Sequence, residues 1–243
     1  MHGLTEIPKR FHYEIFFRNN DQRFEYAVEL DPDTLEHEAP ANAAALWTEL
    51  GYKQCPHCPL SVETTPHCPL ALRVSPLTRV PKCKSYDPVR VVVTQDDKRI
   101  SLDTTAQEAF SSLLGLIMPT SGCPHTSFFK PMAWYHQPFA AADETLFRVC
   151  ASFLMQDFLL NKEPLNQPGN SQQPPDLQAL KTVYSNMHTI NVKLASRLTY
   201  DVQTDSTLNA IVLLDLLTKD MPMAIDDGLN ELQQLFGKSR NHL

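Results

Sequence analysis

Two pairs of short segments near the start of the chain carry the apolar pattern of β-strands. FHYEIFFR (11–18) and RFEYAVEL (23–30) are rich in aromatic and β-branched residues, and a turn-prone polar stretch joins them. VRVVVT (89–94) and RISLDT (99–104) form a second pair of the same kind. The pattern predicts two hairpins in a small antiparallel sheet.

From Thr104 onward the apolar residues recur at helical spacing. Residues 105–118 are predicted to form a buried helix that ends before Pro119, and Asp143 is predicted to cap a helix that runs to about Leu160. A further helix is predicted from apolar residues at helical spacing, namely Leu180, Val183, Met187, Ile190 and Leu194.

Two more helices are predicted near the C-terminus. One begins at Asp205 or Ser206 and runs through Leu217, and Pro222 is expected to separate it from a last amphipathic helix. Residues 161–176 are a loop by composition. The sequence therefore predicts an α+β fold, with a β-rich region over 1–104 and a helical region over 105–243 packed on it.

Between the two hairpins, residues 53–88 are rich in Pro, Cys and His, and only LALRV (70–74) resembles a strand. A segment with so much proline forms little regular structure, so another interaction must order it.

Composition narrows the function classes. The 243 residues are 42% hydrophobic with a net charge of −7, and no run of Lys or Arg indicates a nucleic-acid partner. The apolar runs are shorter than a bilayer span. The first residues lack an apolar stretch followed by a small-residue cleavage site, so we expect a cytoplasmic location.

Four of the six cysteines are followed directly by proline: Cys55, Cys58, Cys68 and Cys123. In the cytosol thiols stay reduced, and closely spaced cysteines more often bind metal than pair with one another. The first two have C-x-x-C spacing, so one turn can supply two ligands. The set predicts a structural zinc site of four thiolates that ties residues 53–88 to the helical region.

Other interpretations of the cysteines stay open. An iron–sulfur cluster is the alternative cofactor, since a cysteine followed by proline occurs in ferredoxin-type ligand runs. Buried thiols without a metal are a further possibility. The fourth ligand is also open, because Cys83, His57, His67 or His125 can replace Cys123 in such a set. Cys150, on the apolar face of a predicted helix, is expected in the core.

The stretch SGCPHTSFFKPMAWYHQPF (121–139) is dense in reactive groups. An enzyme interpretation makes Cys123 a nucleophile with His125 or His136 as its base. No phosphate-binding, dinucleotide-binding or metalloprotease motif accompanies it.

Several motifs together, CPHCPL, HCPLALRV, SGCPHTSFFKPMAWYHQPF and DSTLNAIVLLDLL, resemble a family of bacterial proteins of unknown function. The resemblance covers most of the chain. It implies a bacterial, cytoplasmic protein with no assigned activity, and it supports treating the four Cys-Pro positions as one set.

The leading hypothesis is a non-enzymatic protein with a regulatory or protein-interaction role, acting on a partner or through self-association of its helical half. A closed set of four thiolates leaves no open position for a substrate. The alternatives are a redox or metal sensor with a labile zinc or iron–sulfur centre, and a thiol enzyme that uses Cys123.

Overall fold

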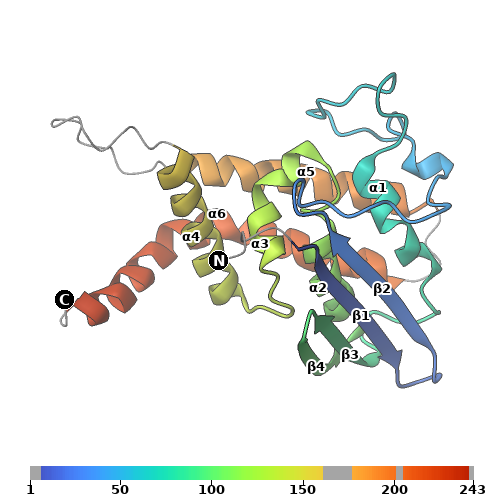
Figure 1. The fold of residues 1–243 in the computed structure, drawn as a ribbon, viewed down its shortest axis with the longest axis horizontal. Helices are drawn as coiled ribbons and strands as arrows, with labels where there is room; N and C mark the ends of the chain where they lie inside the picture. The colour runs from blue at the N-terminus through green and yellow to red at the C-terminus, as the bar shows by residue number, and fades with distance from the viewer. Residues whose placement is uncertain (1–6, 161–176, 201–204, 241–243) are drawn as a thin grey trace.

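The computed structural model describes residues 7–160, 177–200 and 205–240. A four-stranded antiparallel sheet fills the N-terminal half and helices fill the C-terminal half, which confirms the α+β class (Figure 1). The predicted loop over 161–176 lies outside the described residues.

Both predicted hairpins are present and share one sheet. β1 (Lys9–Phe17) pairs with β2 (Arg23–Leu30), and β3 (Pro88–Gln95) pairs with β4 (Lys98–Thr105). β1 and β3 also pair in antiparallel fashion, so the strand order is β2-β1-β3-β4. The two hairpins therefore meet through the first strand of each.

One face of the sheet is buried along β1, β2 and β3, whereas β4 has no buried residue. Every second residue of β1 and β2 is buried on the inner face, as strand periodicity requires: Phe11, Tyr13, Ile15, Phe17, Phe24, Tyr26, Val28 and Leu30. The outer face carries exposed pairs such as Arg10 with Glu29 at 2.8 Å. Pairs this exposed contribute little stability, so burial of the inner face holds the sheet.

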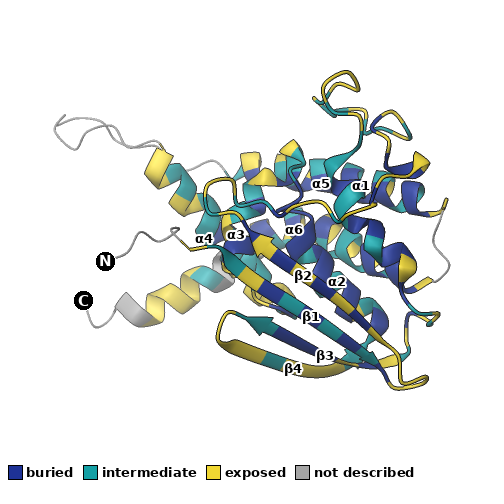
Figure 2. Cartoon of the chain, turned by 45° about the vertical axis from the view of Figure 1, so that its right-hand side comes forward, coloured by how far each residue is buried: buried dark blue, intermediate teal, exposed yellow. Residues whose placement is uncertain are grey.

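Helix α2 (Ala106–Ile117) lies between the sheet and the other long helices (Figure 2). It begins with a capping box, in which Thr105 accepts from the Glu108 amide and Glu108 accepts from the Thr105 amide. Its apolar residues are buried on several sides, as predicted for a buried helix. The packing forms one core that includes side chains from the sheet and from the helical half.

The remaining long helices are α4 (Ala142–Leu160), α5 (Gln178–Leu198) and α6 (Asp205–Arg240), and α5 packs along α6. Both α4 and α5 lie where helices were predicted, although Asp143 lies within the first turn of α4 and does not cap it. Cys150 is buried in the core as expected. Short helical segments complete the fold: η1 (Leu46–Thr48), α1 (Pro69–Val74), η2 (Ser75–Arg79), η3 (Pro124–Phe129) and α3 (Lys130–Trp134).

Two further local predictions were wrong. Residues 70–74 form most of α1 and not a strand, because Pro69 occupies the first helical position, where its missing N–H is not needed. α6 also continues through Pro222. Met221 and Ile225 on either side of this proline are buried, and their packing offsets the lost backbone hydrogen bond.

Among the described residues, no helix combines the length and the apolar character needed to cross a bilayer.

A partly buried polar network joins the sheet to the segment that follows α3. The Tyr13 hydroxyl lies 2.6 Å from Nε2 of His136 and 3.0 Å from the Ser112 hydroxyl on α2. Burial, followed by the positive charge of Arg148, lowers the pKa of His136 to about 3. His136 is therefore neutral at physiological pH.

This network predicts an acid-sensitive stability. The unfolded chain takes up a proton on His136 as the pH falls through about 6.5, whereas the folded protein does so only near pH 3. Stability should therefore fall across this window by a few kcal/mol, on the order expected for one strongly shifted group.

His136→Gln keeps a hydrogen-bonding side chain without the titration, so urea unfolding of this variant should depend less on pH across the window. His37, whose pKa is lowered to about 4 mainly by burial, keeps part of the slope. A variant with the full wild-type slope would contradict the assignment.

Candidate metal centre

The four cysteines that precede proline line one small pocket. Cys55, Cys58, Cys68 and Cys123 come from the proline-rich loop and from the segment after α2, and they surround a space of about 30 Å³. The other lining residues come from these segments and from α5: Leu50, Gln54, Leu60, Pro69, Leu70, His125, Ile190, Lys193, Leu194 and Arg197. The space is of atomic size and most of its walls are apolar.

Cys55 and Cys58 belong to one tight turn. The Cys58 amide donates to the Cys55 carbonyl at 3.0 Å, and Pro56 occupies the second turn position, which its fixed φ favours. The C-x-x-C spacing thus places two thiols on one turn, as a metal knuckle requires.

Cys68 and Cys123 each precede the first residue of a short helical segment. Cys68 is the N-cap of α1, and Cys123 is the N-cap of η3. Pro69 and Pro124 are the first helical residues, a position that proline favours. The Cys-Pro pattern therefore has a local cause at both positions, because the proline starts the helix directly after the thiol.

The backbone before Cys123 is tightly constrained. Gly122 has φ +80, and a Cβ at this position would lie 2.8 Å from a carboxylate oxygen of Glu36. Glu36 is itself held by Lys130 at 2.7 Å. The buried Thr126 hydroxyl donates to the Cys123 carbonyl at 3.0 Å. These contacts fix the position from which the Cys123 side chain projects.

The loop that carries the first three cysteines is held by backbone hydrogen bonds. The Cys68 amide donates to the Thr48 carbonyl at 2.8 Å, and the Leu50 amide donates to the Pro66 carbonyl at 2.9 Å. The Thr48 hydroxyl also lies 3.0 Å from Nδ1 of His67. Cys68 is thus aligned with the segment around η1.

Arg197 on α5 joins the segment around η1, to which Cys68 is hydrogen-bonded, to the helical half. Its guanidinium donates to three backbone carbonyls, those of Trp47 at 2.9 Å, Glu49 at 2.7 Å and Leu50 at 2.9 Å. The side chain is 3% exposed. In the described part of the chain no carboxylate forms an ion pair with it, so a buried positive charge lies beside the four thiols.

The ionisation of the thiols reflects their shared surroundings. Burial, followed by the neighbouring Cys68 and Cys58, raises the pKa of Cys55, while Arg197 and Lys193 oppose the rise. Burial also raises the pKa of Cys123 to about 12, and the charges of Cys68 and Cys55 contribute to this rise. The thiols are therefore close enough for each to oppose the ionisation of the next.

No group of three or more His, Cys, Asp or Glu side chains within the described residues is already arranged to hold a metal ion. The four cysteines line one pocket, but their side chains as placed do not form a metal site.

The alternative ligands lie in different surroundings. His125 lines the same pocket, and its Nε2 lies 2.7 Å from the His57 carbonyl oxygen. The rings of His57 and His125 are 4.2 Å apart, and the buried Nε2 of His57 has no hydrogen-bond partner. Cys83 donates to the Ser206 hydroxyl at 3.2 Å and does not line the pocket.

A nucleophilic role for Cys123 has little support in the geometry. A reactive thiol needs a lowered pKa, and that of Cys123 is raised. The His136 ring is hydrogen-bonded to Tyr13 and lines a different cavity. Among the described contacts, the imidazole rings of His125 and His136 form no hydrogen bond with the Cys123 sulfur, and of these two residues only the backbone of His125 does so.

Sequence analysis missed Lys193 and Arg197. A signal was present for Arg197, which follows Leu194 by three positions and therefore falls on the apolar face of the predicted helix. A charged residue on such a face indicates a buried partner, although the spacing does not identify it.

Comparison of the chain with curated proteins and with solved structures finds no match. A family model described as a domain of unknown function, DUF6901, matches residues 11–237. This confirms the expectation of a family of unknown function. Since the match spans nearly the whole sequence, the chain belongs to the DUF6901 family.

Proposed function

We propose that the protein binds one zinc ion through Cys55, Cys58, Cys68 and Cys123, and that the ion fastens the proline-rich loop to the helical half. The observation that carries this proposal is the juxtaposition of four thiols in one pocket with the buried charge of Arg197.

The positively charged side chains around the pocket support the proposal. Four thiolates around Zn²⁺ carry a net charge of about −2, and such a charge needs nearby cations or amides when it is buried. Arg197 and Lys193 line the pocket and supply two positive charges. The site is therefore electrostatically suited to thiolates, whereas neutral thiols provide no counter-charge for Arg197.

The proposal requires the sulfur atoms to converge. Rotamer changes within the pocket accomplish this while the Cys55–Cys58 turn and the backbone around Cys68 and Cys123 stay in place. Four thiolates complete the tetrahedron of zinc, so the ion has a structural role and offers no open position to a substrate.

The helical half then serves regulation or assembly through protein contacts. Exposed apolar side chains near the end of α4 support this role, among them Met155 at 62% and Leu160 at 81% exposure. Sedimentation of the purified chain at several concentrations distinguishes self-association from a role that requires another protein.

The first test is metal content. Protein purified without added zinc should contain about one zinc ion per chain, and Cys123→Ser should lose most of it because three thiolates leave the tetrahedron incomplete. Elemental analysis measures the stoichiometry. Cys83→Ser is the matched control and should keep the wild-type content, since Cys83 lies outside the pocket.

Other outcomes of this experiment are equally decisive. A stoichiometry well below one ion in a natively folded chain would overturn the proposal. Iron with a visible absorbance band after anaerobic purification would indicate that the cofactor is an iron–sulfur cluster and not zinc. Loss of zinc from His125→Gln but not from Cys123→Ser would identify His125, and not Cys123, as the fourth ligand.

The second test addresses the buried cation. Arg197→Gln removes the positive charge, whereas Arg197→Lys keeps it. A competing chelator should therefore extract zinc about tenfold faster from Arg197→Gln, which corresponds to a difference of about 1.4 kcal/mol in activation free energy. Both variants lose hydrogen bonds to the carbonyls around η1, so both should be less stable by about 1–3 kcal/mol.

Arg79→Gln provides a control, because Arg79 contacts the Asn42 carbonyl and does not line the pocket. It should release zinc at the wild-type rate. Equal rates for Arg197→Gln and Arg197→Lys would show that Arg197 acts on the segment around η1 alone and not on the charge of the thiolates.

A further inference from the structure

Strand β4 is an edge strand of the sheet. The strand order is β2-β1-β3-β4, so β4 pairs with β3 on one side only. Within the described ranges no strand pairs with its other side, and no backbone group of residues 98–104 is hydrogen-bonded there. A row of unpaired N–H and C=O groups of this kind can pair with a strand from another chain.

The inner face of the sheet is covered at β2 but not at β4. The apolar side chains of β2 are all buried, although β2 is also an edge strand. On β4, Ile100 and Leu102 lie opposite the buried Val93 and Val91 and therefore share the inner face. Leu102 is nevertheless 40% exposed, and Figure 2 shows β4 with exposed and half-buried residues along its length.

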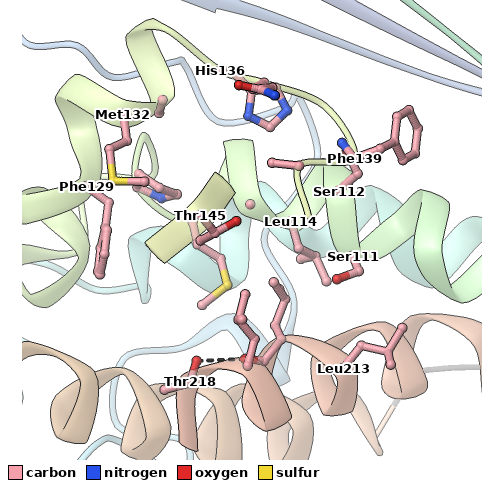
Figure 3. A pocket seen from close by; sticks show the side chains of 18 of the residues that line it. Ser111, Ser112, Leu114, Phe129, Met132, His136, Phe139, Thr145, Leu213 and Thr218 are labelled. Atoms are coloured by element: carbon pink, nitrogen blue, oxygen red, sulfur yellow. Dashed lines mark hydrogen bonds between the residues drawn. The ribbon is translucent and has the colours of Figure 1, made fainter. Parts of the chain in front are cut away.

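The inner side of β4 borders open space. Leu102 lines a large, open cavity of about 460 Å³, whose other walls come mostly from the helices. Figure 3 shows His136 on one side of this cavity and Leu213 and Thr218 of α6 on the opposite side. The helices of the chain therefore leave Leu102 partly uncovered.

The sequence of β4 is complementary to itself in the antiparallel direction. Residues 98–104 read KRISLDT. When two copies pair about Ser101, Arg99 of each copy lies opposite Asp103 of the other, and Ile100 lies opposite Leu102. Symmetry forms each of these pairs twice. This register therefore joins opposite charges on the outer face and apolar side chains on the inner face.

The two charged residues are available for such a pair. Arg99 is exposed, and no described carboxylate forms an ion pair with it. The Asp103 side chain is 58% exposed, and its Oδ1 accepts from Arg18 of its own chain at 2.6 Å. Since a carboxylate has two oxygen atoms, Oδ2 of Asp103 can accept from a second guanidinium.

We propose that two copies of this chain associate through β4, paired in antiparallel fashion about Ser101, so that their sheets join into one. The backbone hydrogen bonds hold the strands together, the Arg99–Asp103 pairs set the register, and the Ile100–Leu102 pairs extend the inner face. This surface shares no residue with the thiol pocket or with α4, so the proposal is independent of the zinc site.

Charge reversal tests the register. Sedimentation should show the wild-type chain passing from monomer to dimer as its concentration rises. Asp103→Arg places two cations opposite each other at both symmetric positions, and Arg99→Asp places two carboxylates there, so each should weaken the dimer at least about tenfold. Circular dichroism checks that each variant is folded.

Restoring the complementary charges should restore the dimer. The double variant R99D/D103R exchanges the two charges and should dimerise about as tightly as the wild type. An equimolar mixture of the two single variants should also dimerise, because each chain supplies the charge that the other lacks. The double variant, like Asp103→Arg, lacks the contact of Arg18 with Asp103, so its recovery cannot come from that contact.

Two controls place the contact on β4. Glu29→Arg reverses an exposed charge on the other edge strand, and Met155→Glu introduces a charge at the apolar end of α4. Neither should change the dimerisation constant. A monomer at every concentration would overturn the proposal, as would a dimer that withstands both single reversals. Weakening by Met155→Glu without weakening by the β4 variants would place the contact on α4 instead, and failure of the double variant to recover would exclude the register.

Discussion

The hydrogen bonds from Arg197 to the segment around η1 are the interaction on which the arrangement around the cysteines depends. This segment precedes the proline-rich loop, and its carbonyls need hydrogen-bond donors where they are shielded from water. One guanidinium on α5 satisfies those of Trp47, Glu49 and Leu50. Because Cys68 is bonded to the same segment through Thr48, fixing this segment also fixes the loop cysteines opposite Cys123.

Helix α5 lies between the two pockets. Ile190, Leu194 and Arg197 line the thiol pocket, while Asn191 and neighbouring residues of the same helix line the large cavity. Ile190 and Asn191 are adjacent in sequence and are both buried, so they project to different sides of one rigid element. A shift of α5 that altered one pocket would therefore alter the other, which is the physical requirement for communication between them.

The features that the sequence predicted well have local causes. Alternation of apolar residues identified both hairpins, and the polar start and apolar body of α2 identified a buried helix. The features it missed depend on tertiary contacts. Pro222 remains within α6 because its neighbours are packed in the core, and Arg197 finds carbonyls up to 150 positions away.

Each of the four cysteines is followed directly by proline, and the structure gives a physical reason for this pattern. Pro56 shapes a turn, and Pro69 and Pro124 start helical segments, so three of the four prolines fix backbone conformation beside a thiol. A backbone fixed in this way loses little entropy when the thiols rotate to bind an ion. As neutral groups, the thiols leave the buried charge of Arg197 balanced only by carbonyl dipoles. In the proposed zinc site, thiolates would balance it with full negative charge, so that binding the ion would stabilise the loop and the buried cation together.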